Sequence, residues 1–418
     1  MKNKSLSDLV DIILSNVDKK TSDNEIPVAL CNFTDVYYNW DVSESDVPSF
    51  MKATATRKEI ARFTIKAGDV LLTKDSETRD DIGMSCYVAG DLGGALLGYH
   101  CALLRPKSGA ISGAYLNAYL QSPLARKYFS NQASGSGQRY TLSVEGIGAV
   151  KIPLPEVKTQ EQIASFLQAI TQKIRVNRLI ISNLHDLILC VFNRWFNQFD
   201  FDQQRPGSGE RQWTYNNVLK KDIPSGWEVA SIAENPLCSF IDVGVPWFLT
   251  KNYLATANVS GTEITDGEYV SYENRESRAN MQPTLNSVWF AKMKNSVKHV
   301  FISSRGQWMV DKYVFSTGFS ALQCTDVSFP YVASVIMQPY FETTKDVLSH
   351  GATQQSVNND DLISIPLLIP PKEVLEKYRA MVGPMFERMN EILRESQCLE
   401  KLRTRLLPLF MNGQISLN

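Results

Sequence analysis

A four-and-three spacing of apolar residues in the middle of the chain constrains its fold more than any other feature. The positions are Ile163, Leu167, Ile170, Ile174, Asn177, Ile181, Leu184, Ile188, Val191 and Trp195. Nine of these ten residues are apolar, and a 3.5-residue period is typical of a helix that packs lengthwise against another helix. We therefore predict a long central helix over residues 156–200 that requires a partner helix.

A second series with the same spacing predicts that the partner lies in the same chain. It comprises Leu375, Tyr378, Val382, Met385, Met389, Ile392, Ser396, Leu399, Arg403, Leu406 and Phe410. An apolar run that ends in proline precedes each series, at residues 152–155 and 367–371. We predict a C-terminal helix over residues 370–412, kinked or broken at Pro384, that pairs with the central helix as an antiparallel coiled coil.

The two regions that precede these helices repeat one pattern. Residues 286–292 parallel residues 68–74, and residues 318–322 parallel residues 99–103. Short apolar runs between turn residues indicate strands in both regions, and Leu6, Leu9, Val10, Ile13 and Leu14 have the pattern of a short amphipathic helix that ends near Val17. The predicted fold class is α+β, with two α/β domains in tandem at residues 1–155 and 218–369. A long helix follows each domain, and a linker occupies residues 201–217.

Composition narrows the class of protein. The chain has 418 residues, of which 44% are hydrophobic, and no stretch is apolar enough to predict a transmembrane helix. The formal net charge is −1, so any nucleic-acid surface must be a local basic patch. Seven cysteines without a CxxC pair favour neither a disulfide framework nor a zinc site, and they suit a reducing cytoplasm.

These motifs, in this order, resemble the DNA specificity subunit of type I restriction–modification systems. Glu161 and Gln162 open the first helix, and Arg194, Trp195 and Phe196 close it. An Ile-Pro-Ser-Gly-Trp segment at residues 223–227 opens the second domain, and a Gly-Gln-Ile segment at residues 413–415 ends the pattern. The similarity extends over nearly the whole chain.

The resemblance implies a non-catalytic subunit that recognises double-stranded DNA. Each α/β domain would be a target recognition domain for one half of a bipartite site. The paired helices would space the two domains and dock two methyltransferase subunits, with restriction subunits as possible further partners. It implies no cofactor in this chain, because S-adenosylmethionine would be bound by the methyltransferase partners.

The length of the central helix agrees with that function. A helix from Ile163 to Trp195 rises about 48 Å at roughly 1.5 Å per residue. At roughly 3.4 Å per base pair this corresponds to on the order of 14 base pairs. Asn177 in the apolar series suits a register lock for the coiled coil, although a tolerated polar residue that faces solvent is an equal alternative.

Two polar loops ahead of the helices are the best candidates for DNA contacts. Their candidate residues are Ser136, Gln138, Arg139 and Tyr140 in the first loop, and Thr353, Gln354 and Gln355 in the second. Arg and Gln side chains can form two hydrogen bonds to one base, and a Gly-Ser backbone can approach a phosphate closely. The alternative is a pair of flexible turns without a ligand.

Basic residues after one apolar strand of each domain are secondary candidates. They are Lys74 and Arg79 in the first domain and Lys292, Lys294 and Arg305 in the second. A single surface cation is more often only solvated. Tyr37, Tyr38 and Trp40 could form an aromatic reading surface, but core packing is the more common use of such residues.

Motifs of catalysis are missing from the sequence. It contains no Asn-Pro-Pro-aromatic tetrapeptide, no Gly-x-Gly-x-x-Gly motif and no phosphate-binding loop, and its four histidines are scattered. Metal ligands are not predicted. Two alternatives stay open: a stand-alone DNA-modifying enzyme with an unfamiliar site, and a coiled-coil scaffold that does not read DNA.

Overall fold

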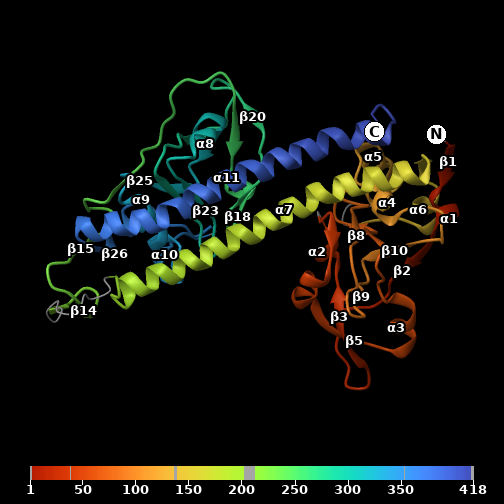
Figure 1. Ribbon diagram of the computed structural model, residues 1–418, viewed down its shortest axis with the longest axis horizontal. Coiled ribbons are helices and arrows are strands. Elements are labelled where there is room, and N and C mark those ends of the chain that lie inside the picture. The colour runs from red at the N-terminus through yellow and green to blue at the C-terminus, as the bar shows by residue number, and fades with distance from the viewer. Residues whose placement is uncertain (1, 38, 136–138, 202–211, 353, 416–418) are drawn as a thin grey trace. The chain divides into compact units, whose positions relative to one another are not determined.

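The computed structural model describes the chain except residues 1, 38, 136–138, 202–211, 353 and 416–418. The chain divides into two compact units: unit 1 comprises residues 1–174 and 399–418, and unit 2 comprises residues 175–398. Two long helices, α7 (Val157–Phe192) and α11 (Lys372–Met411), each contribute one segment to unit 1 and one to unit 2 (Figure 1). Most of the predicted linker lies outside the described residues, and its end contains strand β13 (Trp213–Asn216). Within the described residues, no helix is long and apolar enough to cross a membrane.

Unit 1 is built on a five-stranded sheet with the order β2-β10-β6-β8-β4. These strands are β2 (Val10–Leu14), β10 (Cys101–Pro106), β6 (Val70–Thr73), β8 (Ser85–Val88) and β4 (Asp41–Val42). The other strands are β5 (Met51–Ala55), β3 (Ile26–Cys31) and β9 (Leu96–Leu97), which form a three-stranded sheet, and the pairs β1 (Lys2–Ser5) with β12 (Lys151–Leu154) and β7 (Asp75–Ser76) with β11 (Tyr140–Thr141). The helices are α1 (Leu6–Leu9), α2 (Phe33–Val36), η1 (Glu44–Ser49), α3 (Arg57–Phe63), α4 (Gly113–Leu120), α5 (Pro123–Gln132) and α6 (Val144–Gly148). All four residues of β6 are buried, which explains its continuous apolar sequence.

Unit 2 contains two four-stranded sheets. The first has the order β16 (Cys238–Phe240), β25 (Phe319–Cys324), β22 (Ser287–Ala291) and β23 (His299–Ile302), and the second has the order β20 (Tyr269–Val270), β17 (Lys251–Leu254), β24 (Tyr313–Ser316) and β21 (Ala279–Met281). The remaining strands pair as β13 with β14 (Lys221–Pro224), β15 (Glu228–Ser231) with β26 (Pro366–Ile369), and β18 (Val259–Ser260) with β19 (Glu263–Ile264). The helices are η2 (Asn193–Asn197), η3 (Thr256–Asn258), α8 (Gln307–Lys312), α9 (Phe329–Ile336), α10 (Pro339–Leu348) and η4 (Asp361–Ser364).

The main sheets of the two units repeat one framework. The order β2-β10-β6-β8 in unit 1 corresponds to β16-β25-β22-β23 in unit 2. The hydroxyl of Tyr115 donates to the carbonyl oxygen of Pro153 at 2.9 Å, and that of Tyr331 donates to the carbonyl oxygen of Leu368 at 2.6 Å. Each bond ties a helix to the strand that leads into a long helix. The mixed α and β content predicted from the sequence is confirmed.

Segments of α7 and α11 run in opposite directions within each unit. In unit 1 the rings of Phe166 and Phe410 lie 5.7 Å apart, and Arg403 donates to the hydroxyl of Thr171 at 3.3 Å. In unit 2 the rings of Trp195 and Tyr378 lie 5.5 Å apart, and the residues around Asn177 meet those around Glu395. In both units the residue numbers rise along one helix as they fall along the other.

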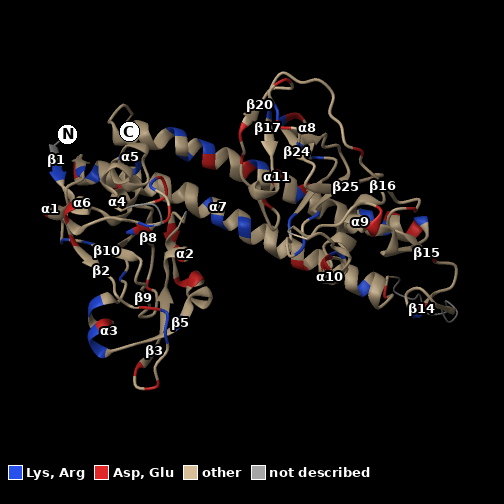
Figure 2. Cartoon of the chain, turned by 180° about the vertical axis from the view of Figure 1, so that it is seen from behind, with Lys and Arg blue, Asp and Glu red and all other residues tan. Residues whose placement is uncertain are grey.

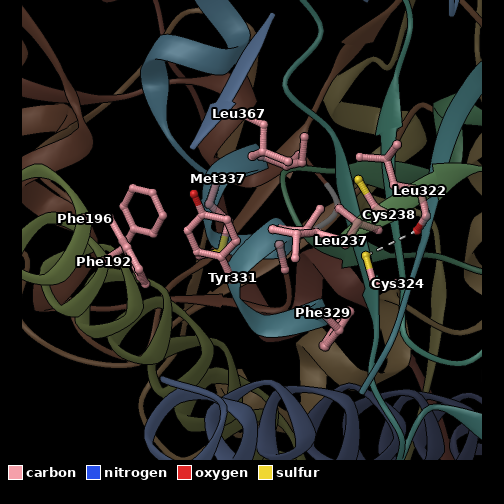
Figure 3. Packing of buried hydrophobic residues seen from close by; sticks show 14 of the residues in the cluster. Phe192, Phe196, Leu237, Cys238, Leu322, Cys324, Phe329, Tyr331, Met337 and Leu367 are labelled. Carbon is pink, nitrogen blue, oxygen red and sulfur yellow. Dashed lines mark hydrogen bonds between the residues drawn. The ribbon is translucent and has the colours of Figure 1, made fainter. Parts of the chain in front are cut away.

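The end of α7 and the helical turn η2 that follows it complete the largest apolar core of unit 2. Figure 3 shows Phe192 and Phe196 beside Tyr331 of α9. The ring centroid of Tyr331 lies 5.9 Å from that of Phe192 and 4.7 Å from that of Phe196. These aromatic side chains bury large areas, so they fix the helix end against α9.

Two local predictions are wrong. The expected helix that begins near Leu6 and ends near Val17 is helical only at Leu6–Leu9, because Val10–Leu14 pairs with β10 as a strand of the main sheet. The expected break at Pro384 does not occur, since α11 is a single helix. Pro384 and Ala380 are exposed, so the carbonyl oxygen that loses its partner can be hydrated, while buried Val382 and Phe386 hold the helix on both sides.

Asn177 is buried, which excludes the interpretation that it faces solvent. Its Nδ2 donates to Glu395 Oε2 and to Ser396 Oγ, both at 3.0 Å, but its Oδ1 has no partner among the described residues. Asn390 is also buried, and both of its polar side-chain atoms have partners: its Oδ1 accepts from Ser303, and its Nδ2 donates to the carbonyl oxygen of Phe301.

These two asparagines predict opposite responses to one substitution. Asn177→Leu removes a buried oxygen without a partner, and its two acceptors are half-buried and can be hydrated, so the thermal unfolding midpoint should stay the same or rise. Asn390→Leu leaves several buried groups without a hydrogen-bond partner, which costs about 1–3 kcal/mol each, so it should lower the midpoint strongly. Thermal unfolding followed by circular dichroism measures both; an equal loss in the two variants would contradict the prediction.

Candidate nucleic-acid interface

The first polar loop is held at the end of strand β6 by backbone pairing. Strand β11 pairs with β7, so that Tyr140 lies opposite Ser76 and Thr141 opposite Asp75. The amide of Leu142 donates to the carbonyl oxygen of Lys74 at 2.8 Å, and the amide of Lys74 donates to that of His100 at 2.9 Å. The end of β6, the start of β10 and the end of β11 therefore meet at one edge of the unit 1 sheet.

Asp75 collects four side-chain contacts at this edge. Its Oδ2 lies 2.8 Å from Lys74 Nζ, 3.0 Å from His100 Nδ1 and 3.2 Å from Arg139 Nη2, and its Oδ1 accepts from Thr141 Oγ1 at 2.7 Å. Burial acts to raise the pKa of Asp75, but the hydrogen bonds that Lys74 and Thr141 donate, together with the charge of Lys74, outweigh it and lower the pKa to about 2. Asp75 is thus a buried carboxylate ringed by donors.

The structure brings four of the predicted residues together here. Arg139 is half-exposed above Asp75, and the guanidinium of Arg79 lies 5.1 Å from the ring centroid of Tyr140. Lys74 differs from the expectation of a surface cation, because its side chain is only 10% exposed and its charge acts on Asp75. Ser136 and Gln138 lie outside the described residues.

A cavity of about 590 Å³ opens beside this cluster. Its lining includes Phe33, Tyr37, Asp75, His100 and Arg139. Tyr37 therefore borders the candidate interface. Trp40 instead packs against the core of unit 1, and Tyr38 lies outside the described residues.

Unit 2 repeats the backbone frame of this loop. The amide of Val357 donates to the carbonyl oxygen of Lys292 at 3.1 Å, and the amide of Lys292 donates to that of Gly318 at 3.0 Å. Lys294 donates from Nζ to Gln355 Oε1 at 2.8 Å, so these two predicted residues meet. Gln354 is exposed beside them.

The other candidates of unit 2 are placed differently. Lys292 is half-buried, and burial lowers the pKa of its ammonium group. Arg305 lies near α11, where its guanidinium is 3.2 Å from Glu391 and 3.7 Å from Glu387, and it does not join the Lys294–Gln355 pair. Thr353 lies outside the described residues.

Both loops begin with a glycine that other residues cannot replace without strain. Gly135 has a φ of +136°, and a Cβ there would lie 2.1 Å from the carbonyl oxygen of Arg139. Gly351 has a φ of +128°, and a Cβ there would lie 2.7 Å from the carbonyl oxygen of Gln354. In each unit the glycine lies close to a later carbonyl group of the same loop, and by this contact Arg139 corresponds to Gln354.

The matching hydrogen bonds pair residues of different chemistry. His100 corresponds to Gly318, and Asp75 corresponds to Met293. The sequence comparison aligned Gly318 with Tyr99 and was one residue out of register. It also missed Asp75 and His100 as site residues; the available signal was a polar residue shortly after the apolar strand β6 and another directly before the apolar strand β10.

Charged residues are dispersed over both units (Figure 2). Lys and Arg gather locally, as on α3 with Arg57, Lys58 and Arg62, while acidic and basic residues both occur along α11. In the described part of the chain, no group of three or more His, Cys, Asp and Glu residues could hold a metal ion. The cysteines are free.

Comparisons with known proteins agree with this architecture. The family described as "Type I restriction modification DNA specificity domain" matches residues 1–185. The HindI specificity subunit of Haemophilus influenzae is 21% identical over 85% of this chain and 88% of its own length. The MjaIX specificity subunit of Methanocaldococcus jannaschii is 22% identical over 74% of this chain and 70% of its own length.

A crystal structure of a type I restriction–modification S subunit from M. genitalium has a similar fold. It gives a TM-score of 0.51 at 11% identity, covering 98% of this chain and 95% of that one. The chain is therefore similar to type I restriction–modification specificity subunits, and its residues 1–185 match their DNA specificity domain.

The lowered pKa of Asp75 predicts a stability difference that depends on pH. A carboxylate with a pKa of about 2 in the folded protein and 3.8 ordinarily contributes about 2 kcal/mol above pH 4, and the contribution disappears as the pH falls through 2. Asp75→Asn should therefore lower the unfolding midpoint at pH 7 and have little further effect near pH 2. Asp18→Asn, which removes an exposed carboxylate of the same unit, is the control. A midpoint difference that does not change with pH would refute the role of Asp75.

Proposed function

We propose that this specificity subunit reads a bipartite DNA target, one half with the loop of each unit. One observation carries the proposal: a single hydrogen-bonded frame presents different side chains in the two units. Arg139 and Tyr140 stand where the second loop has Gln354 and Gln355. Backbone bonds do not depend on side-chain identity, so the frame can be kept while the exposed residues differ. Two tandem target recognition domains with different half-sites account for this pattern.

The chemistry of the loops differs in the bases it suits. The guanidinium of Arg139 offers a planar fork of donors that matches guanine O6 and N7 or a phosphate. The amides of Gln354 and Gln355 can each donate and accept, which matches adenine N7 and N6. We therefore expect a guanine contact or a phosphate contact in the first half-site and an adenine contact in the second.

We further propose that α7 and α11 pair as an antiparallel coiled coil that sets the spacer between the half-sites. Supporting contacts are Phe166 with Phe410 in unit 1 and Trp195 with Tyr378 in unit 2. Asn177 would fix the register through Glu395 and Ser396, because a shifted helix would leave its buried amide without partners.

The expected partners follow from the family. The paired helices would dock two methyltransferase subunits, and restriction subunits would complete the nuclease complex. S-adenosylmethionine would bind to the methyltransferase subunits, and this chain would hold no cofactor. Host DNA in the cytoplasm is the expected substrate of the assembly.

The proposal predicts that each loop controls one half of the methylated motif. The chain is co-expressed with its methyltransferase subunit, and modified bases in host DNA are mapped by single-molecule sequencing. Arg139→Ala should alter only one half of the motif, and Gln354→Ala with Gln355→Ala only the other, each with about a tenfold loss of discrimination at the base contacted. Lys66→Ala is the matched control for Arg139→Ala. It also removes an exposed cation of unit 1, but Lys66 precedes β6, whereas the candidate interface lies after β6.

Three results would overturn the proposal. Methyl transfer by the purified chain alone would favour a stand-alone enzyme. An unchanged motif in both loop variants would favour a scaffold that does not read DNA. A motif without two separate halves would exclude the bipartite target.

A further inference from the structure

The exposed Arg139 of the first loop is hydrogen-bonded to the buried side chain of Asp75. Arg139 is half-exposed, whereas the side chain of Asp75 below it is only 7% exposed. Lys74 Nζ and Thr141 Oγ1 fix the two oxygens of Asp75 from within the unit, at 2.8 and 2.7 Å. Lys74 also compensates the charge of Asp75, so the positive charge of Arg139 is not cancelled at the surface.

His100 supplies a second point of attachment. Its Nδ1 lies 2.7 Å from Arg139 Nη2 and 3.0 Å from Asp75 Oδ2. One nitrogen cannot both accept from Arg139 and donate to Asp75, so holding Arg139 requires the tautomer with the proton on Nε2. The two hydrogens of Nη2 then point to Asp75 and to His100.

Neighbouring rings fix the orientation of His100 itself. Its ring centroid lies 4.9 Å from that of Tyr99 and 5.9 Å from that of Phe33, both in edge-to-face geometry. The ring therefore has little freedom to turn Nδ1 away from Arg139.

We propose that Asp75 and His100 are positioning residues that pre-orient Arg139 for one base or phosphate of the first half-site. The inference rests on the proposed function and adds the residues that determine its precision. Nη2 is held, while Nε and Nη1 have no partner among the described residues and stay available to DNA. Fixing a long side chain before binding removes most of its ordering cost, which can reach about 2 kcal/mol for an arginine.

Unit 2 lacks this arrangement and so provides an internal control. Met293 and Gly318 stand at the positions of Asp75 and His100. Met293 has no carboxylate and Gly318 has no imidazole nitrogen, so neither side chain can hold an arginine in the same way. The second loop is tied instead by Lys294 to Gln355. Changes at Asp75 or His100 should therefore leave the second half-site unchanged.

The test compares motifs methylated by the full complex of specificity and methyltransferase subunits. Wild type is mapped first, followed by Asp75→Asn, Asp75→Glu, Arg139→Gln and the double variant Asp75→Asn with Arg139→Gln. Asp75→Asn and Arg139→Gln should relax the same position of the same half-site about tenfold. The double variant should match Arg139→Gln alone, because Asp75 acts through Arg139. Asp75→Glu should restore part of the discrimination.

A second variant covers the case in which Asp75→Asn does not fold. His100→Phe keeps the ring contacts with Phe33 and Tyr99 but removes Nδ1, and His100 is 36% exposed, so folding should be retained. It should relax the same position more weakly than Arg139→Gln. Asp18→Asn is the control for loss of a carboxylate in unit 1.

The outcomes separate this inference from the function on which it rests. A wild-type motif without two halves defeats both. A bipartite motif that Arg139→Gln relaxes, but that foldable Asp75→Asn and His100→Phe leave unchanged, overturns the positioning role alone. A lower unfolding midpoint in Asp75→Asn with an intact motif would show a structural role only and overturns it as well.

Discussion

Burial of the apolar seam on α7 is the constraint on which the rest of the structure depends. In unit 1, Ile163 and Leu167 lie in one core cluster with Leu407 and Phe410. In unit 2, Ile181 and Ile188 lie in one cluster with Met389 and Ile392. Neither sheet is covered by its own domain alone, because each core includes side chains from both long helices. A helix that must serve two cores keeps a strict apolar period over its whole length.

The same requirement separates the fixed from the variable parts of the chain. Buried strands such as β6 and β22 are held by backbone bonds and apolar packing, and they keep the same neighbours in both units. The segments at Leu142 and Val357, which follow the two polar loops, are joined by backbone bonds to Lys74 and Lys292 at the ends of these strands. Exposed side chains such as Arg139 and Gln354 can therefore differ without altering these backbone bonds.

Periodic features were predictable from the sequence, and contacts between strands were not. The four-and-three spacing identified both long helices because it persists over many turns, whereas residues 10–14 were assigned to a helix although β10 takes them into the sheet. The helix was expected to break at Pro384 because proline leaves one backbone carbonyl oxygen without a hydrogen bond. Since Pro384 is exposed, water can satisfy that oxygen, and the cost of continuing the helix is smaller. Asp75 and His100 are 25 residues apart and meet only because β6 and β10 are neighbours, so a scan for nearby motifs could not pair them.

Charge pairing also bears on how the subunit would bind DNA. The net charge is −1, and several cations are already engaged with acids, as Lys74 is with Asp75, Lys312 with Asp266 and Arg305 with Glu391. A surface of this kind displaces few counterions, so it gains little of the sequence-independent affinity that strongly basic proteins obtain from phosphates. Discrimination then depends more on contacts with base edges, and those require side chains already held in place. A pre-oriented arginine would serve such discrimination, because less of its conformational entropy remains to be lost on binding.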